Sequence, residues 1–137
     1  MVPSLAAVQA LTGSNPGPYL YPADQSAAWD AFVAAISSYP AASSVPAAVV
    51  ADQGNASLNW FAGTDPAGRG IATIDVPTLI ADGTADRIDA TTNNHALAKL
   101  IRGARLVLYP DAGHAFLFQE GTPFTSLIES FLGGARA

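Results

Sequence analysis

Cysteine is absent from this 137-residue sequence, and its absence removes several classes of chemistry at once. A chain without cysteine has no disulfides, no thiolate metal ligands and no cysteine nucleophile, and its redox compartment stays open. Catalysis by side chains therefore has to use oxygen or imidazole groups. Only two histidines are present, His95 and His114, so the candidates for imidazole chemistry are few.

Positive charge is also scarce, since the chain has a net charge of −5, one lysine and five scattered arginines. Nucleic-acid binding depends on clustered cations, so we expect no nucleic-acid partner. No stretch approaches the roughly 20 apolar residues of a membrane-spanning helix, and the opening MVPSLAAVQALTGS lacks the basic and apolar parts of a signal peptide. We therefore expect a soluble, cytoplasmic protein with no membrane partner.

The first half of the chain has the pattern of short helices joined by loops. Half of the whole sequence is apolar and 12% is charged, which is typical of a single globular domain. Asp24 is a possible cap for one helix, and Ser44 followed by Pro46 predicts the start of another. No strand is expected here. The first helix has an apolar stripe of Trp29, Phe32, Val33 and Ile36.

The second half alternates between two periodicities. VPTLIADG and ARLVLYP are short apolar runs that predict strands, and ATTNNHALAKLIRG between them predicts a helix. TPFTSLIESFLGG predicts a last helix, with Thr122 as its cap and Pro123 as its first residue. The expected fold class is α/β, with a βαβα unit whose two strands are parallel.

Two turns in this unit carry the residues best suited to chemistry. Parallel strands end at the same edge of a sheet, so the turn after the first strand and the turn after the second are expected to be neighbours. The first contains Asp86 in GTAD, and the second contains His114 in DAGH. A carboxylate beside an imidazole fixes its tautomer and stabilises its protonated form, so the two residues match two-thirds of a catalytic triad.

The segment VPTLIADGTADRIDATTNNHALAKLIRGARLVLYPDAGHAFLFQEGTPFTSLIESFL resembles the C-terminal end of an α/β-hydrolase. In that family the acid follows a G-x-x-D turn, the histidine follows the last strand, and the chain order is Ser, Asp, His. The resemblance covers about 60 residues, Ile74 to Leu132. It implies that Asp86 orients His114 and that His114 acts as general base and then general acid.

The first half resembles, more weakly, the helical cap that this family places over its active site. We therefore expect residues 1–72 to form a cap-like region and residues 73–137 to form the C-terminal part of the hydrolase core. Ordinary packing is the alternative for each aromatic side chain of the cap-like region. Those expected to line an apolar acyl or alkyl pocket are Tyr19, Tyr21, Trp29, Phe32, Trp60 and Phe61.

The nucleophile of the family is missing from the sequence. Neither a G-x-S-x-G elbow nor an oxyanion-hole loop is present, and Ser14 and Ser57 are not placed between glycines after an apolar strand. Two strands alone would also leave open sheet edges. We therefore expect a C-terminal portion of an ester-hydrolysing enzyme that needs an N-terminal hydrolase half or a second copy. The alternative is a non-catalytic binding or assembly module derived from a hydrolase.

The remaining polar residues have simpler explanations. His95 is expected on the exposed start of a helix, while Asp82, Asp89 and Asp111 suit a strand end, a helix cap and a turn. A metal site built from Asp86, Asp111 and His114 is a weak alternative, because no H-x-x-x-H or H-x-H spacing accompanies it. We expect no metal and no cofactor. For His114 itself, the alternative is a polar turn residue that packs beside Phe116 and Phe118.

Overall fold

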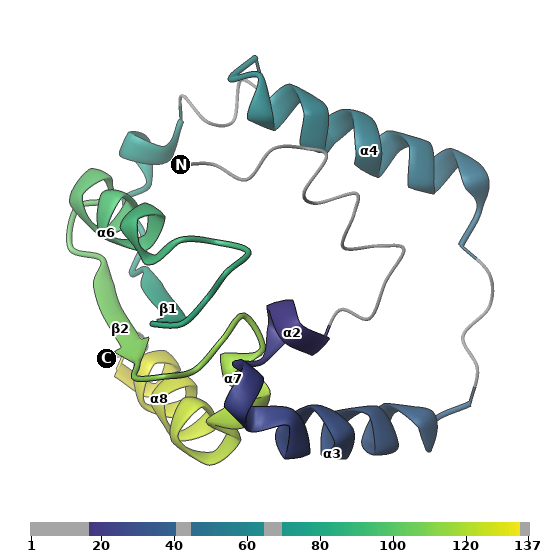
Figure 1. Ribbon diagram of the computed structural model, residues 1–137. Coiled ribbons are helices and arrows are strands. Elements are labelled where there is room, and N and C mark those ends of the chain that lie inside the picture. Colours follow the sequence, from purple (N-terminus) through teal and green to yellow (C-terminus); the bar gives the residue numbers. More distant parts are fainter. Residues whose placement is uncertain (1–16, 41–44, 65–69, 135–137) are drawn as a thin grey trace.

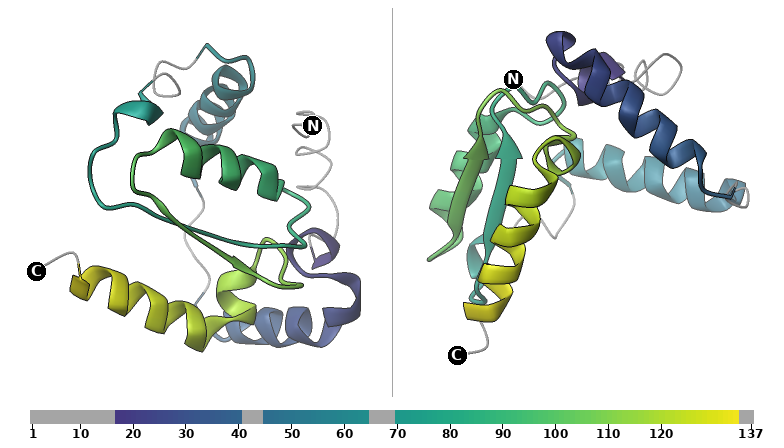
Figure 2. Two further views of the ribbon diagram at one scale, coloured as in Figure 1. Left: turned by 90° about the vertical axis from the view of Figure 1, so that its left-hand side faces the viewer. Right: turned by 90° about the horizontal axis from the view of Figure 1, so that it is seen from below.

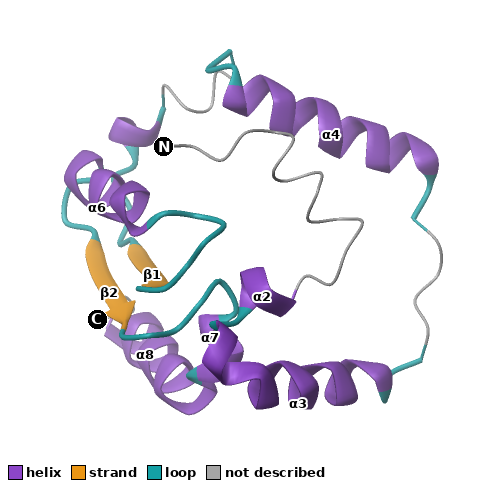
Figure 3. Cartoon of the chain, viewed as in Figure 1, coloured by secondary structure: helices purple, strands orange, loops and turns teal. Residues whose placement is uncertain are grey.

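A pair of parallel strands forms the sheet of the structure, a computed structural model that describes residues 17–40, 45–64 and 70–134. Strand β1 is Leu79–Gly83 and strand β2 is Arg105–Tyr109. They pair in parallel, with Leu79 opposite Arg105 and Gly83 opposite Tyr109 (Figure 3). Both strands coincide with the apolar runs of the sequence, so the parallel pairing predicted from the βαβα pattern is confirmed.

Helices cover the two faces of this strand pair. Helix α6, Thr91–Leu100, lies on one side and helix α8, Gly121–Gly134, on the other (Figure 2). Alternate strand residues point to opposite faces, so each strand contributes to both layers. On the α8 face, the buried side chains of Tyr109, Ala112 and Phe116 form the core. The partly buried residues packed against this core are Ala81, Val107, Phe124 and Leu127.

Three details of the βαβα unit differ from the sequence prediction. A short helix, α7 (Phe116–Gln119), follows the His114 turn and was not predicted. Helix α8 already begins at Gly121, so the prediction that Thr122 caps it and Pro123 is its first residue is wrong. Asp89 does not cap α6 either: the N-cap is Ala90, which makes no side-chain capping bond, and Asp89 accepts a 2.5 Å hydrogen bond from the Asn93 side chain instead.

The described residues before the sheet are helical, as predicted, and contain no strand. Asp24 lies inside the 3-10 helix η1, and the residue before α3 is Gln25, so the predicted Asp24 cap is wrong. Helix α4 follows Pro46 and runs through Gly54 without a break, while Ser44 lies outside the described residues. The elements are α2 (Gly17–Leu20), η1 (Ala23–Gln25), α3 (Ser26–Ser37), α4 (Ala47–Phe61) and η2 (Ile71–Thr73).

The two longer helices of the first half are placed differently. Helix α3 lies next to α7, whereas α4 lies on the far side of the molecule, away from the strands (Figure 1). Every residue of α4 is exposed. Within the described part of the chain, no helix has the length and apolar character needed to cross a membrane. A cap-like role for residues 1–72 stays a prediction.

Candidate active site

The turns that follow β1 and β2 are joined by three hydrogen bonds. The Thr84 amide donates to the Tyr109 carbonyl at 2.9 Å, and the Ala85 amide donates to the Ala112 carbonyl at 2.8 Å. The hydroxyl oxygen of Thr84 in turn accepts from the Asp111 amide at 2.8 Å. The structure therefore brings together the two turns that the sequence predicted to be neighbours.

Close backbone contacts of these turns require glycine at two positions, Gly83 between the two turns and Gly113 against α2. A Cβ atom on Gly83 would lie 2.1 Å from the carbonyl oxygen of Ala112. A Cβ atom on Gly113 would lie 2.5 Å from the carbonyl oxygen of Leu20 in α2. Neither backbone oxygen can move away without displacing its turn, so both glycines fix the approach of the chain next to His114.

Asp86 and His114 meet across the joined turns. Nδ1 of His114 lies 2.7 Å from Oδ2 of Asp86. The other carboxylate oxygen of Asp86, Oδ1, accepts hydrogen bonds from the amides of Ile88 at 2.6 Å and Asp89 at 2.8 Å. The Asp86 side chain is only 1% exposed, whereas that of His114 is 44% exposed. A carboxylate with three donors thus holds one edge of an imidazole whose ring remains accessible.

Electrostatics at this pair favour the charged forms of both groups. The hydrogen bond that His114 donates to Asp86 raises the pKa of His114 above its ordinary value, although burial acts in the opposite direction. Burial alone would raise the pKa of Asp86, but the hydrogen bonds from His114 and from the two amides outweigh it and lower the pKa. Asp86 is therefore ionised near neutral pH, where it can stabilise a protonated His114.

Two glutamines hold the His114 turn from outside, and the sequence analysis did not identify them. Gln119 accepts from the Gly113 amide at 2.8 Å and donates to the side-chain oxygen of Gln25. Gln25 donates to the carbonyl of Asp111 at 3.1 Å. These contacts join residues 86 and 94 positions apart, so no local pattern could have indicated them.

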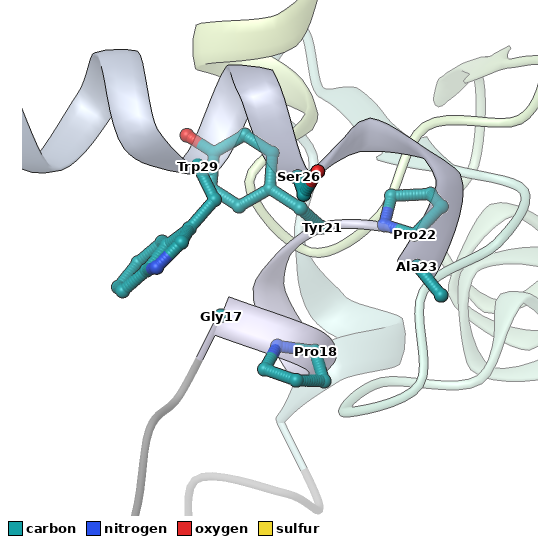
Figure 4. Close-up of a pocket in the computed structure, with 7 residues that line it drawn as sticks. All are labelled: Gly17, Pro18, Tyr21, Pro22, Ala23, Ser26 and Trp29. Atoms are coloured by element: carbon teal, nitrogen blue, oxygen red, sulfur yellow. The ribbon is translucent and has the colours of Figure 1, made fainter.

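Three of the six aromatic residues predicted for a pocket lie together beside this turn. Tyr21, Trp29 and Phe32 have ring centroids 5.9 to 6.1 Å apart, and Phe118, which the sequence did not suggest, lies 4.8 Å from Phe32. Tyr21 and Trp29 also border a cavity of about 120 Å³ (Figure 4). The other residues of its wall are Gly17, Pro18, Pro22, Ala23 and Ser26.

The other three predicted pocket residues lie elsewhere. Tyr19 stacks under the guanidinium of Arg87, with 5.5 Å between the guanidinium carbon and the ring centroid. Trp60 and Phe61 are at the end of α4, where they are 51% and 40% exposed. A substrate-binding role for any of the six aromatic residues stays a prediction.

A nucleophile is not found beside His114 among the described residues. Nε2 of His114 has no hydrogen-bond partner within residues 17–40, 45–64 and 70–134. Ser57 is on exposed α4, where its hydroxyl donates to the Gln53 carbonyl at 3.0 Å, and Ser14 lies outside the described residues. The same described ranges hold no group of three or more side chains suited to a metal ion. His95 is exposed on α6, as predicted.

Comparison with known proteins gives a limited result. No family model matches the chain. Among solved structures, the chain is similar to a thermophilic esterase from Thermogutta terrifontis, determined with malate bound, at 27% identity and a TM-score of 0.46. The similarity covers 48% of this chain and 24% of the esterase chain, so this chain spans about a quarter of the esterase's length.

Proposed function

We propose that this chain supplies the general base and the orienting carboxylate of a hydrolase that cleaves a small ester or related acyl substrate. The observation that carries the proposal is the 2.7 Å contact between Nδ1 of His114 and Oδ2 of Asp86. The carboxylate is buried and held by two further amides, while the imidazole is accessible. An imidazole fixed at Nδ1 presents Nε2 as the atom that exchanges protons.

In the proposed reaction, Nε2 of His114 takes the proton of a serine hydroxyl while the serine oxygen attacks the carbonyl carbon. Asp86 stabilises the resulting imidazolium. Nε2 then returns the proton to the leaving alcohol as the ester C–O bond breaks. A water molecule, deprotonated in the same way, hydrolyses the acyl-serine. These steps need no cofactor.

In our proposal, the serine comes from a second polypeptide that contributes an N-terminal hydrolase half. A second copy of this chain is a weaker choice, because it would have the same sequence without a G-x-S-x-G elbow. The aromatic side chains of Tyr21, Trp29 and Phe32 beside the His114 turn favour an apolar acyl group. The cavity at Tyr21 and Trp29 is small, which favours a short one.

Hydrolysis of p-nitrophenyl butyrate tests this proposal. The 137-residue chain is assayed alone and with a polypeptide that contributes an N-terminal hydrolase half with a G-x-S-x-G elbow, which supplies the serine. We expect no turnover above the buffer blank for the chain alone and turnover for the mixture. His114→Ala should lower that turnover on the order of 10⁴-fold or more, and Asp86→Asn should also lower it strongly.

His95→Ala is the matched control, because it removes the other histidine from an exposed position on α6. It should leave turnover unchanged. Turnover that survives His114→Ala, or the absence of turnover in the mixture, would contradict the proposal and favour a non-catalytic binding module. If the chain alone turns over the ester and His114→Ala abolishes this turnover, His114 is still the general base, but the serine lies within the 137 residues.

A further inference from the structure

Behind the Asp86 and His114 pair, two buried polar side chains face each other between β1 and α6. Asp82 is 6% exposed and Asn94 is 5% exposed. Because strand residues alternate between faces, Asp82 points away from the core on the α8 side and toward α6, which lies on the opposite side of the strands (Figure 2). The sequence suggested only a strand-end role for Asp82, and it gave Asn94 no role.

Hydrogen bonds hold the Asp82 carboxyl in one position. Its Oδ2 accepts from the Asn94 side-chain amide, and its Oδ1 accepts from the Gly83 amide at 2.7 Å. Both donors are neutral, and no positively charged group among the described residues forms an ion pair with Asp82. A buried carboxylate without an opposite charge is costly, so a purely structural link between β1 and α6 would not need an ionisable group.

The charge of Asp82 contributes to the pKa of His114, and the charge of Asp86 contributes to the pKa of Asp82. Burial raises the pKa of Asp82 to about 6; the Gly83 and Asn94 hydrogen bonds oppose this shift, and the negative charge of Asp86 adds to it. In the other direction, the charge of Asp82 is among the groups that raise the pKa of His114. Asp82 therefore changes its charge near pH 6, whereas the raised pKa of His114 lies above 6.5.

Among the described residues, the elements next to Asp82 bring no ionisable side chain against it other than those of the active-site turns. Across the strand pair, Asp82 is opposite Leu108 of β2. Helix α7 also contacts β1, and its residues are Phe, Leu, Phe and Gln. On α6, His95 and Lys99 are exposed to solvent. The charged groups that remain are Asp86 and His114 themselves and Asp89, whose charge also acts on His114.

We propose that Asp82 is a positioning residue: its carboxyl, fixed by Asn94 behind Asp86, sets how strongly the Asp86 and His114 pair holds a proton. When Asp82 is ionised, a second negative charge lies near the imidazole and strengthens it as a base. When Asp82 is protonated, that contribution is removed. The consequence for catalysis rests on the function proposed above, whereas the effect on His114 does not.

Proton titration of the two histidines by NMR tests the proposal on the full chain without any substrate. The chain contains only His95 and His114, and His95→Gln assigns their ring signals. In the parent protein, we expect the His114 signal to show a small inflection near the Asp82 pKa of about 6 and a larger one above 6.5.

In Asp82→Asn, the small inflection should disappear and the pKa of His114 should fall, by less than it falls in Asp86→Asn. Asp52→Asn is the matched control, because it removes one carboxylate from exposed α4 and should leave the His114 titration unchanged. A His114 titration in Asp82→Asn that equals that of the parent would overturn the proposal.

Asn94→Ala is a second variant that keeps the carboxyl of Asp82. It removes a hydrogen bond that lowers the Asp82 pKa, so the small inflection should move above pH 6. An unmoved inflection would contradict the assignment to Asp82. If Asp82→Asn shifts His114 but turnover does not depend on His114, the proposed function fails and this inference stands. If turnover depends on His114 but Asp82→Asn leaves the His114 titration unchanged, the proposed function stands and this inference fails.

Discussion

Residues 70–134 and helix α4 contain similar apolar side chains but use them in opposite ways. In the first region, Tyr109, Ala112 and Phe116 are buried against β1 and α8, and the adjacent turns are held by hydrogen bonds on several sides. In α4, Val50 is 56% exposed and Trp60 is 51% exposed. An amphipathic pattern specifies a helix, whereas burial depends on a partner surface. Asp86 and His114, the two residues best suited to catalysis, both lie within residues 70–134, the region that has such a partner surface.

Glycine-to-alanine substitutions should give the largest difference in the free energy of unfolding between the two regions. Gly83→Ala would put a Cβ atom 2.1 Å from the Ala112 carbonyl oxygen, so we expect a loss of about 3 kcal/mol or more in the free energy of unfolding. Gly54→Ala in α4 meets nothing within 4 Å and should stabilise the chain by up to about 1 kcal/mol. Urea unfolding measures both. Equal effects would contradict the comparison.

Removing the buried carboxylate should have the next largest effect. Asp86→Asn keeps an acceptor for the amides of Ile88 and Asp89 but loses the charge that pairs with His114. We expect a loss of roughly 1 to 3 kcal/mol in the free energy of unfolding, and the pKa of His114 should fall. Asp30→Asn on the exposed side of α3 is the control and should change stability by less than about 0.5 kcal/mol.

The two tryptophans offer a smaller and more direct comparison. Trp29 contacts Tyr21 and Phe32, so Trp29→Ala should cost roughly 1 to 2 kcal/mol. Trp60 is 51% exposed, and Trp60→Ala should stay within about 0.5 kcal/mol. Thermal unfolding followed by circular dichroism measures the difference. A larger loss at Trp60 would mean that α4 is packed in solution.

The smallest expected effect is on the pH dependence of stability, because water screens the half-exposed His114. A raised His114 pKa contributes stability below 6.5 that is lost as pH rises through the raised value. Asp82 acts in the same direction, since its folded-state pKa of about 6 favours the folded state below that pH. The lowered Asp86 pKa contributes stability above 3.8, which is lost as pH falls through its folded-state value.

Unfolding free energies at pH 5.5 and pH 8 measure the result. The parent protein should be more stable at pH 5.5 than at pH 8, and the difference should shrink in Asp82→Asn and in His114→Ala. A protein that gains stability between pH 5.5 and pH 8 would show that these groups do not control its titration.

The sequence predicted the local elements of the βαβα unit and the pairing of Asp86 with His114. The G-x-x-D and G-H turns could be identified because each follows an apolar strand, and parallel strands place both turns at one edge. The contact of Asp82 with Asn94 and the link from Gln25 to Gln119 could not be predicted. They join residues 12 and 94 positions apart through side chains whose packing depends on the whole fold.

Helix ends were also predicted less well than helices. Asp24 and Thr122 have the side chains of good N-caps, but a 3-10 helix precedes α3 and α8 begins at Gly121, two residues before the predicted start at Pro123. In both places a short helix, η1 or α7, comes shortly before the next helix.

The tautomer of neutral His114 tests the central claim most directly. A long-range proton–nitrogen NMR spectrum, recorded above the pKa of His114, shows which ring nitrogen carries the proton. We predict a proton on Nδ1, donated to Asp86, with an unprotonated Nε2, and we expect Asp86→Asn to weaken this preference. A neutral ring protonated on Nε2 in the parent protein would contradict the assignment of His114 as the general base.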